Sequence, residues 1–226
     1  MDRKYLYIGG GAVAVIAVAL LAWLLWPRSA PTVAGASDSG RVQLTADDHS
    51  LGSPNAPIQV VEYAAPICPH CAHFDMDVFP QVKKAFIDTG KVHYTVRIYP
   101  ISQVDIAVAG MAACLPRDQF FSFLDLMWRN QAKWDPENQV QDVHGGLVEM
   151  GRIAGLSEQR VDACIQNQEV SKQVQKQAQE ASVAYGIDGV PSFIVNGELV
   201  HSGFYPWNEI KALLDSKLKK PAPSGG

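Results

Sequence analysis

The feature that most constrains the fold is a pair of cysteines, Cys68 and Cys71, which lies between two different hydrophobic patterns. Residues 58–63 (IQVVEY), just before the pair, are rich in β-branched and aromatic side chains, as strands are. Over residues 74–86, after the pair, apolar side chains recur every four positions, a spacing typical of one helix face. Pro69 follows Cys68 directly, and proline is favoured in the first turn of a helix. The pattern therefore predicts a strand that ends shortly before Cys68, and a helix whose N-terminus lies at Cys68.

The sequence beyond this unit completes an α/β pattern. Residues 92–98 place apolar side chains at every second position, which indicates another strand, parallel to the first and joined to it by a right-handed connection. Residues 102–185 suit a block of helices. Asn196-Gly197 is a strong hairpin signal, and the segment from Pro206 suits a closing helix. The predicted order is β-α-β, a helical block, then β-β-α.

Several chemical roles are open to two cysteines with this spacing. A c-type haem site requires histidine after the second cysteine, and Ala72 occupies that position. A structural zinc site usually needs a second close pair, whereas Cys114 and Cys164 are fifty positions apart. The apolar run from Tyr5 to Trp26 predicts that the domain is exported, and inert buried thiols are disfavoured there because an extracytoplasmic compartment oxidises cysteine pairs. A redox pair is the favoured interpretation, and a metal-handling role stays open as an alternative.

The predicted position of Cys68 gives its sulfur a specific chemistry. At a helix N-terminus, the free N–H groups of His70 and Cys71 and the helix dipole favour a thiolate over a thiol. A protonated or donating His70 side chain adds to this effect. A stabilised thiolate makes the disulfide easier to reduce and the protein a stronger oxidant. We therefore expect Cys68 to be the attacked sulfur and the less exposed Cys71 to be the resolving thiol.

An apolar run without a charged residue begins at Tyr5 and ends at Trp26. A helix of that length can cross the roughly 30 Å hydrocarbon core of a bilayer. Arg3 and Lys4 precede the run, so we expect a single-pass anchor in the inner membrane, with the rest of the chain on the periplasmic side. The alternative is a signal peptide cleaved near Ala36, which would leave a soluble periplasmic domain.

Two stretches, EYAAPICPHCAHF and GVPSF, together resemble the DsbA family of thiol–disulfide oxidoreductases in the thioredoxin superfamily. The resemblance covers residues 49–218 and implies an α/β thioredoxin fold with an inserted all-helical domain, and no cofactor. It implies a cis Val190–Pro191 bond in a substrate-binding loop beside the cysteines; an ordinary trans proline is the alternative. It also implies that Glu62 is a buried acid near the resolving cysteine. The alternative for Glu62 is a partly exposed acid at a strand end, without catalytic effect.

This resemblance and the composition divide the chain into six expected segments. The segments are a cytoplasmic stub and anchor (1–28), a flexible linker (29–48), the first half of the thioredoxin fold (49–101), the inserted helical domain (102–185), the second half of the thioredoxin fold (186–219) and a flexible tail (220–226).

The function that the resemblance implies is an exported dithiol oxidase, which donates its Cys68–Cys71 disulfide to newly translocated proteins through a mixed disulfide. Pro69 and His70 form the dipeptide associated with oxidising members. The implied partners are unfolded cysteine-containing proteins and a DsbB-like, quinone-linked membrane oxidase, and we expect a monomer. An isomerase or reductase of the same fold, or a non-catalytic metal-handling module, are the alternatives. A net charge of −4 without a block of basic residues argues against nucleic-acid binding.

Cys114 and Cys164 are predicted to form a second, structural disulfide inside the helical block. Both lie in apolar helical segments, and an unpaired couple is disfavoured in an oxidising compartment. Two separate buried thiols are the alternative, because sequence alone does not show whether the Cα atoms lie within the ~4.4–6.8 Å that a bridge requires.

Overall fold

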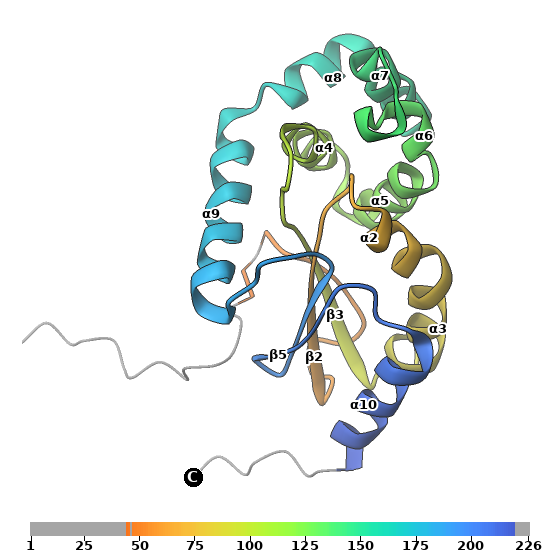
Figure 1. Cartoon of the computed structure of the whole chain (residues 1–226), viewed down its shortest axis with the longest axis vertical. Helices are drawn as coiled ribbons and strands as arrows, with labels where there is room; N and C mark the ends of the chain where they lie inside the picture. Colours follow the sequence, from red (N-terminus) through yellow and green to blue (C-terminus); the bar gives the residue numbers. More distant parts are fainter. Residues whose placement is uncertain (1–43, 46, 220–226) are drawn as a thin grey trace, which may run out of the picture. The chain divides into compact units, whose positions relative to one another are not determined.

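A mixed five-stranded sheet lies at the centre of the part of the chain that the structure, a computed structural model, describes: residues 44–45 and 47–219 (Figure 1). Across the sheet the strands are β1 (His49–Leu51), β3 (Val92–Ile98), β2 (Ile58–Ala64), β4 (Ser192–Val195) and β5 (Glu198–Ser202). β2 and β3 are parallel, and the other neighbouring pairs are antiparallel. The parallel pair confirms the strand–helix–strand unit predicted from the sequence.

A long helical stretch connects β2 to β3. It is made of α2 (Pro69–His73), η1 (Phe74–Val78), α3 (Phe79–Val82) and η2 (Lys83–Ile87). Just before Pro80 the turn is wide, because the N–H of Phe79 donates to the carbonyl of Phe74. Proline has no N–H to donate and its ring crowds the preceding turn, so a wide turn accommodates Pro80 within the helix. The apolar face predicted for this helix is buried: Phe74, Val78, Val82 and Phe86.

Helices fill the chain between β3 and β4. They are α4 (Gln103–Ala113), η3 (Arg117–Gln119), α5 (Phe120–Arg129), α6 (Gln131–Trp134), η4 (Pro136–Asn138), α7 (Val143–Ile153), α8 (Glu158–Ile165) and α9 (Gln168–Tyr185). In Figure 1, α6, α7 and α8 curve around α4 beyond one end of the sheet, and α9 brings the chain back along one side. A disulfide joins Cys114, which caps the C-terminus of α4, to Cys164 in α8, with Cα atoms 6.1 Å apart. The predicted second disulfide is therefore confirmed.

The last part of the chain adds a hairpin and a helix. β4 and β5 are joined through Asn196 and Gly197, whose φ angles are 51° and 86°. These positive angles are the ones that asparagine and glycine adopt most readily in a tight hairpin turn. The chain then closes with α10 (Trp207–Lys219), which buries Ile210 and Leu214. The predicted hairpin and closing helix are both confirmed.

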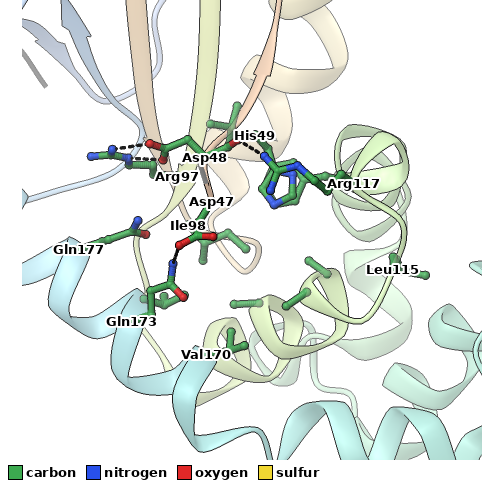
Figure 2. A pocket seen from close by; sticks show the side chains of 16 residues that line it. Asp47, Asp48, His49, Arg97, Ile98, Leu115, Arg117, Val170, Gln173 and Gln177 are labelled. Atoms are coloured by element: carbon green, nitrogen blue, oxygen red, sulfur yellow. Dashed lines mark hydrogen bonds and ion pairs between the residues drawn. The ribbon is translucent and has the colours of Figure 1, made fainter. Parts of the chain in front are cut away.

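β1, the short strand at one edge of the sheet, is not predicted from the sequence. β1 pairs with β3, and a buried ion pair just before it fixes the chain: the Asp48 carboxylate accepts two hydrogen bonds of 2.7 Å from the Arg97 guanidinium (Figure 2). Arg97 also donates to the hydroxyl of Tyr63 at 3.0 Å. The pair borders a cavity of about 240 Å³ between this sheet edge, α4 and α9.

The predicted membrane anchor and most of the predicted linker precede residue 44, and the predicted tail follows residue 219. These predictions lie outside the described residues. Across residues 44–45 and 47–219, no helix combines the length and the apolar character that a bilayer crossing needs. Anchoring of the chain therefore stays a prediction from its sequence.

Candidate active site

The loop between β2 and α2 places Cys68 at the start of a helix. Cys68 is the N-cap residue of α2, with an extended backbone (φ −73°, ψ 120°), and Pro69 occupies the first turn. The N–H of Ala72 donates to the carbonyl of Cys68 at 3.1 Å and closes that turn. Cys68 and Cys71 are both free thiols in the structure, and both are buried. The pair thus lies one helical turn apart at a strand-to-helix junction.

The two thiols differ in acidity. The pKa of Cys68 is lowered to about 6, chiefly because the Cys71 thiol donates a hydrogen bond to its sulfur, while burial acts in the opposite direction. The N–H groups of Cys71 and His70 and the charge of His70 also lower this pKa, although they make no regular cap hydrogen bond with the sulfur. Burial, and next the neighbouring Cys68, raise the pKa of Cys71 well above its usual value. Near neutral pH, Cys68 is therefore a thiolate and Cys71 a thiol.

The loop before β4 lies against the cysteine pair. The peptide bond between Val190 and Pro191 is cis. The carbonyl oxygen of Val190 lies 3.5 Å from the Cys68 sulfur and accepts a hydrogen bond from it when Cys68 is protonated. The hydroxyl of Ser192 donates to the Gly189 carbonyl at 2.7 Å, which closes the loop on itself. The fold thus brings residues 122 positions apart in the chain to the same sulfur.

Glu62 lies inside the protein on β2, only 3% exposed. The hydroxyl of Tyr94 donates to its Oε2 at 2.8 Å, whereas its Oε1 has no hydrogen-bond partner among the residues that the structure describes. Burial raises the pKa of Glu62 to about 7; the Tyr94 hydrogen bond lowers it, and the Cys68 thiolate raises it further. The alternative of a partly exposed acid is therefore wrong, and Glu62 can exchange a proton near neutral pH.

Asp75 is a titratable neighbour that the sequence patterns did not single out. Burial raises its pKa, and the charges of Glu62 and Asp125, together with a hydrogen bond to Asp125, raise it further. The spacing offered one signal, because Asp75 follows Cys71 by four residues and so lies on the same face of the helix. The carboxyl groups near the redox pair therefore extend from Glu62 towards α5.

The inserted helices hold the loop that leads into Cys68. The indole N–H of Trp128 in α5 donates to the carbonyl of Ala65 at 3.2 Å. The side-chain amide of Gln131 in α6 donates to the carbonyl of Pro66 at 2.9 Å. Both contacts cross more than sixty positions of sequence, and no local pattern in either segment predicts them. The helical insertion is thus part of the framework of the redox site.

Replacement of His70 with leucine is expected to raise the pKa of Cys68 and to make the reduction potential more negative. The variant removes the charge of the ring and keeps the backbone N–H. We expect a change of about 30 mV, which corresponds to about 1.4 kcal/mol for this two-electron couple. Ultraviolet titration of the thiolate and equilibration with glutathione measure the two quantities.

The matched control for this variant is His73→Leu. His73 lies on the same helix, but its ring pairs with Asp77 at 3.1 Å and stacks on Phe204, with ring centroids 4.2 Å apart. The control should leave the pKa of Cys68 in place. Equal shifts in both variants, or none in His70→Leu, would contradict the assigned effect of His70.

Residues 44–216 match a protein family described as Thioredoxin. A relative from Rickettsia felis, named as a protein-disulfide oxidoreductase, is 30% identical over 80% of this chain and 64% of its own length. A relative from Bacillus cereus, named as a disulfide bond formation protein D, is 30% identical over 76% of this chain and 79% of its own length. The chain covers about two thirds of the length of the rickettsial relatives, from 62% to 66%.

Solved structures show the same fold. A crystal structure of alpha-DsbA1 from Wolbachia pipientis matches with a TM-score of 0.70 at 25% identity, over 77% of this chain and 92% of that one. A structure from Novosphingobium aromaticivorans, titled as a protein-disulfide isomerase, matches with a TM-score of 0.67 at 25% identity, over 76% and 98% of the two chains. The thioredoxin fold with a helical insertion, predicted from the sequence, is confirmed.

Proposed function

Because this chain belongs to the DsbA-like proteins of the thioredoxin family, we propose that it is a thiol–disulfide oxidoreductase that acts as a dithiol oxidase. One observation carries the proposal: the pKa of Cys68 is lowered to about 6, while that of Cys71 is raised. A stabilised Cys68 thiolate favours the reduced pair, so the oxidised pair tends to accept electrons from substrate thiols.

In the proposed reaction, the protein begins with a disulfide between Cys68 and Cys71. A substrate thiolate attacks the sulfur of Cys68, a new S–S bond forms, and the sulfur of Cys71 leaves with the electron pair of the broken bond. A second substrate thiolate attacks the substrate sulfur of this mixed disulfide, and Cys68 leaves as a thiolate. The substrate loses two electrons and gains a disulfide, and the cysteine pair gains the two electrons.

Glu62 is proposed to supply the proton that the leaving Cys71 sulfur takes up. The thiolate of Cys71 is unstable in its site, because the residue is buried and its pKa is raised. Glu62 is also buried, and its pKa of about 7 lets it release and regain a proton near neutral pH. The Val190–Pro191 loop is proposed to hold the substrate backbone, which its position beside Cys68 supports.

The proposed place of action is outside the cytoplasm. The apolar run from Tyr5 to Trp26 supports a single-pass anchor in the inner membrane, and the Cys114–Cys164 disulfide suits an oxidising compartment. The proposed substrates are newly exported proteins with free cysteines. A DsbB-like, quinone-linked membrane oxidase would restore the Cys68–Cys71 disulfide after each cycle, and the protein would act as a monomer.

A disulfide isomerase is the second candidate function. It is favoured by the likeness to the Novosphingobium aromaticivorans structure that carries this title. An isomerase works from its reduced form, attacks a wrong disulfide, and releases the substrate with no net gain or loss of electrons. Both functions use the Cys68 thiolate. An oxidase starts its cycle with the Cys68–Cys71 disulfide, whereas an isomerase starts with the two free thiols.

The oxidised protein is expected to introduce one disulfide per molecule into a reduced, unfolded model protein without another oxidant. Its reduction potential is expected to be less negative than the roughly −270 mV of thioredoxin, whose thiolate has a pKa of about 7. Free-thiol titration and equilibration with glutathione measure these properties, with Cys68→Ser as the inactive control. A potential at or below that of thioredoxin would favour a reductase. Efficient rescue of a scrambled substrate by the reduced protein, without net oxidation of a reduced one, would favour an isomerase.

A further inference from the structure

A tight, buried turn leads into Cys68. The N–H of Cys68 donates to the carbonyl of Ala65 at 3.1 Å, and Pro66 occupies the second position of the turn, where proline is favoured. All the residues from 65 to 68 are buried. Backbone polar groups that are closed off from water need hydrogen-bond partners within the protein. The peptide groups of this turn therefore depend on other segments of the chain.

Side chains of the helical insertion bind three consecutive residues of this turn. The carbonyl of Ala65 accepts from Trp128 at 3.2 Å, the carbonyl of Pro66 accepts from Gln131 at 2.9 Å, and the N–H of Ile67 donates to Asp105 at 2.9 Å. The Ala65 carbonyl also accepts from the N–H of Cys68, and Asp105 also accepts from two N–H groups just before α4. Gln131 is therefore the partner whose removal acts most directly on this turn.

The backbone of Gln131 is itself held firmly. Gln131 begins α6, and Trp134 in the same short helix is fully buried and donates its indole N–H to the carbonyl of Met127 at 2.9 Å. On the other side, α7 lies against α6 so closely that a Cβ at Gly146 would come within 2.3 Å of the Lys133 carbonyl oxygen. Only glycine allows such an approach of two backbones. The side-chain amide of Gln131 is thus a fixed point against which the turn rests.

The turn sets the position of the Cys68 sulfur. The hydrogen bonds that lower the pKa of Cys68 come from the Cys71 thiol and from the N–H groups of Cys71 and His70. Hydrogen bonds weaken steeply as distance and angle depart from their best values, so their strength depends on where the sulfur lies. In the oxidised protein, the S–S bond itself ties the Cys68 sulfur to Cys71. A firmly held turn therefore stabilises the reduced, thiolate form more than the disulfide form.

We propose that Gln131 is a positioning residue for the Cys68 thiolate, which acts through the carbonyl of Pro66, and that the helical insertion thereby contributes to the reduction potential of the cysteine pair. This inference rests on the proposed function, because it names a residue outside the thioredoxin elements that makes the pair more oxidising. Coupling between two sites acts in both directions, so a change in the position of α6 would also change the potential.

Gln131→Met tests this role, because methionine has a similar length and shape but no N–H to donate. We expect the pKa of Cys68 to rise and the equilibrium with glutathione to move about threefold towards the oxidised protein, a smaller effect than the loss of a whole hydrogen bond. A threefold change corresponds to a potential about 14 mV more negative for this two-electron couple. Ultraviolet titration of the thiolate and equilibration with glutathione measure the two quantities.

Asn130→Leu is the matched control. Asn130 is the neighbouring amide and is also half-buried, but its side chain donates at 2.8 Å to the carbonyl of Leu126, within its own helical segment. The control should lower the free energy of unfolding of the reduced and the oxidised protein equally, and it should leave the pKa of Cys68 in place. Gln131→Met should instead destabilise the reduced protein more than the oxidised one, as denaturant unfolding of both forms would show.

The inference is overturned if Gln131→Met leaves the pKa of Cys68 and the glutathione equilibrium unchanged, or if Asn130→Leu shifts them equally. Gln131→Ala removes the same donor without an apolar side chain, and it should give the same shifts if the methionine variant does not fold. Failure of the proposed function would look different, because the oxidised natural protein would then oxidise no unfolded substrate, whatever residue stands at position 131.

Discussion

Replacement of Cys71 with serine is expected to trap the protein as a mixed disulfide with its substrate, joined through Cys68. In this variant the Cys68 thiolate can still attack a substrate disulfide, but the protein has no thiol at position 71 to attack Cys68 and release the adduct. Serine suits the experiment because its hydroxyl can still donate to the Cys68 sulfur, as the Cys71 thiol does. The protein should therefore react with no more than one substrate sulfur and then stop.

Non-reducing electrophoresis and peptide mapping of the trapped adducts measure this outcome. Cys68→Ser is the control and should form no adduct. Cys71→Ala is a second control, which also removes the donor, and its Cys68 should have a higher pKa than in Cys71→Ser. Adducts that map to a cysteine other than Cys68, or steady turnover by Cys71→Ser, would show that the roles of the two thiols are wrongly assigned.

Glu62→Gln is expected to stabilise the reduced protein by about 3 kcal/mol at pH 8.5 and to change it little at pH 4. The pKa of Glu62 rises from its usual value of 4.5 to about 7 on folding, chiefly through burial. A tenfold change in acidity corresponds to about 1.4 kcal/mol. The folded protein holds this proton more tightly than the unfolded chain, so the ionisable side chain costs stability as pH rises from about 4.5 to about 7.

Denaturant unfolding of both proteins at pH 4 and pH 8.5, under a reductant, measures this difference. The other titrating groups are present in both proteins, so the difference reports the charge of Glu62 together with its effect on its neighbours Cys68 and Asp75. Tyr94 can still donate to the amide oxygen of glutamine, so the packing around residue 62 is largely kept. Equal stabilisation at both pH values would mean that the effect comes from shape or hydrogen bonding rather than from the buried charge.

The sequence predicts the local geometry of the cysteine pair well because its main determinants are local. Four features follow one another within thirty residues: a strand pattern, two cysteines, Pro69 and a helical period. Each of them influences the backbone conformation of residues that are close to it in the sequence. From the sequence, the acidity of Cys68 is attributed to the helix N–H groups and to His70. In the structure the largest contribution is the hydrogen bond from Cys71, which depends on the side-chain geometry of one turn.

Other parts of the site depend on contacts that no local pattern encodes. The neighbours of Glu62 come from another strand (Tyr94) and from the helix that follows the cysteines (Asp75). Asp105 reads in the sequence only as an acidic residue near a helix start, and its bond to Ile67 depends on how two loops meet. Pairings between distant segments are set by tertiary packing, which local sequence patterns do not carry.

β1 was not predicted from the sequence because it, too, depends on contacts with a distant segment. Three residues are too few to show the alternation of apolar and polar side chains that marks a strand. β1 is held by its pairing with β3 and by the ion pair of Asp48, the residue before it. Without Arg97, forty-nine positions away, Asp48 reads only as the last polar residue of a linker. The stability of this edge therefore comes from its partner strand rather than from its own sequence.

The ion pair between Asp48 and Arg97 also has a mechanical consequence. Any pull along the chain from its N-terminal side enters the sheet at β1, and Asp48 is the residue immediately before it. Two parallel hydrogen bonds of 2.7 Å therefore meet that force before the strand pairing of β1 does. In the membrane-anchored form that we propose, a force along the N-terminal segment would load this ion pair before the strand pairing of β1, at a point remote in sequence from the redox pair.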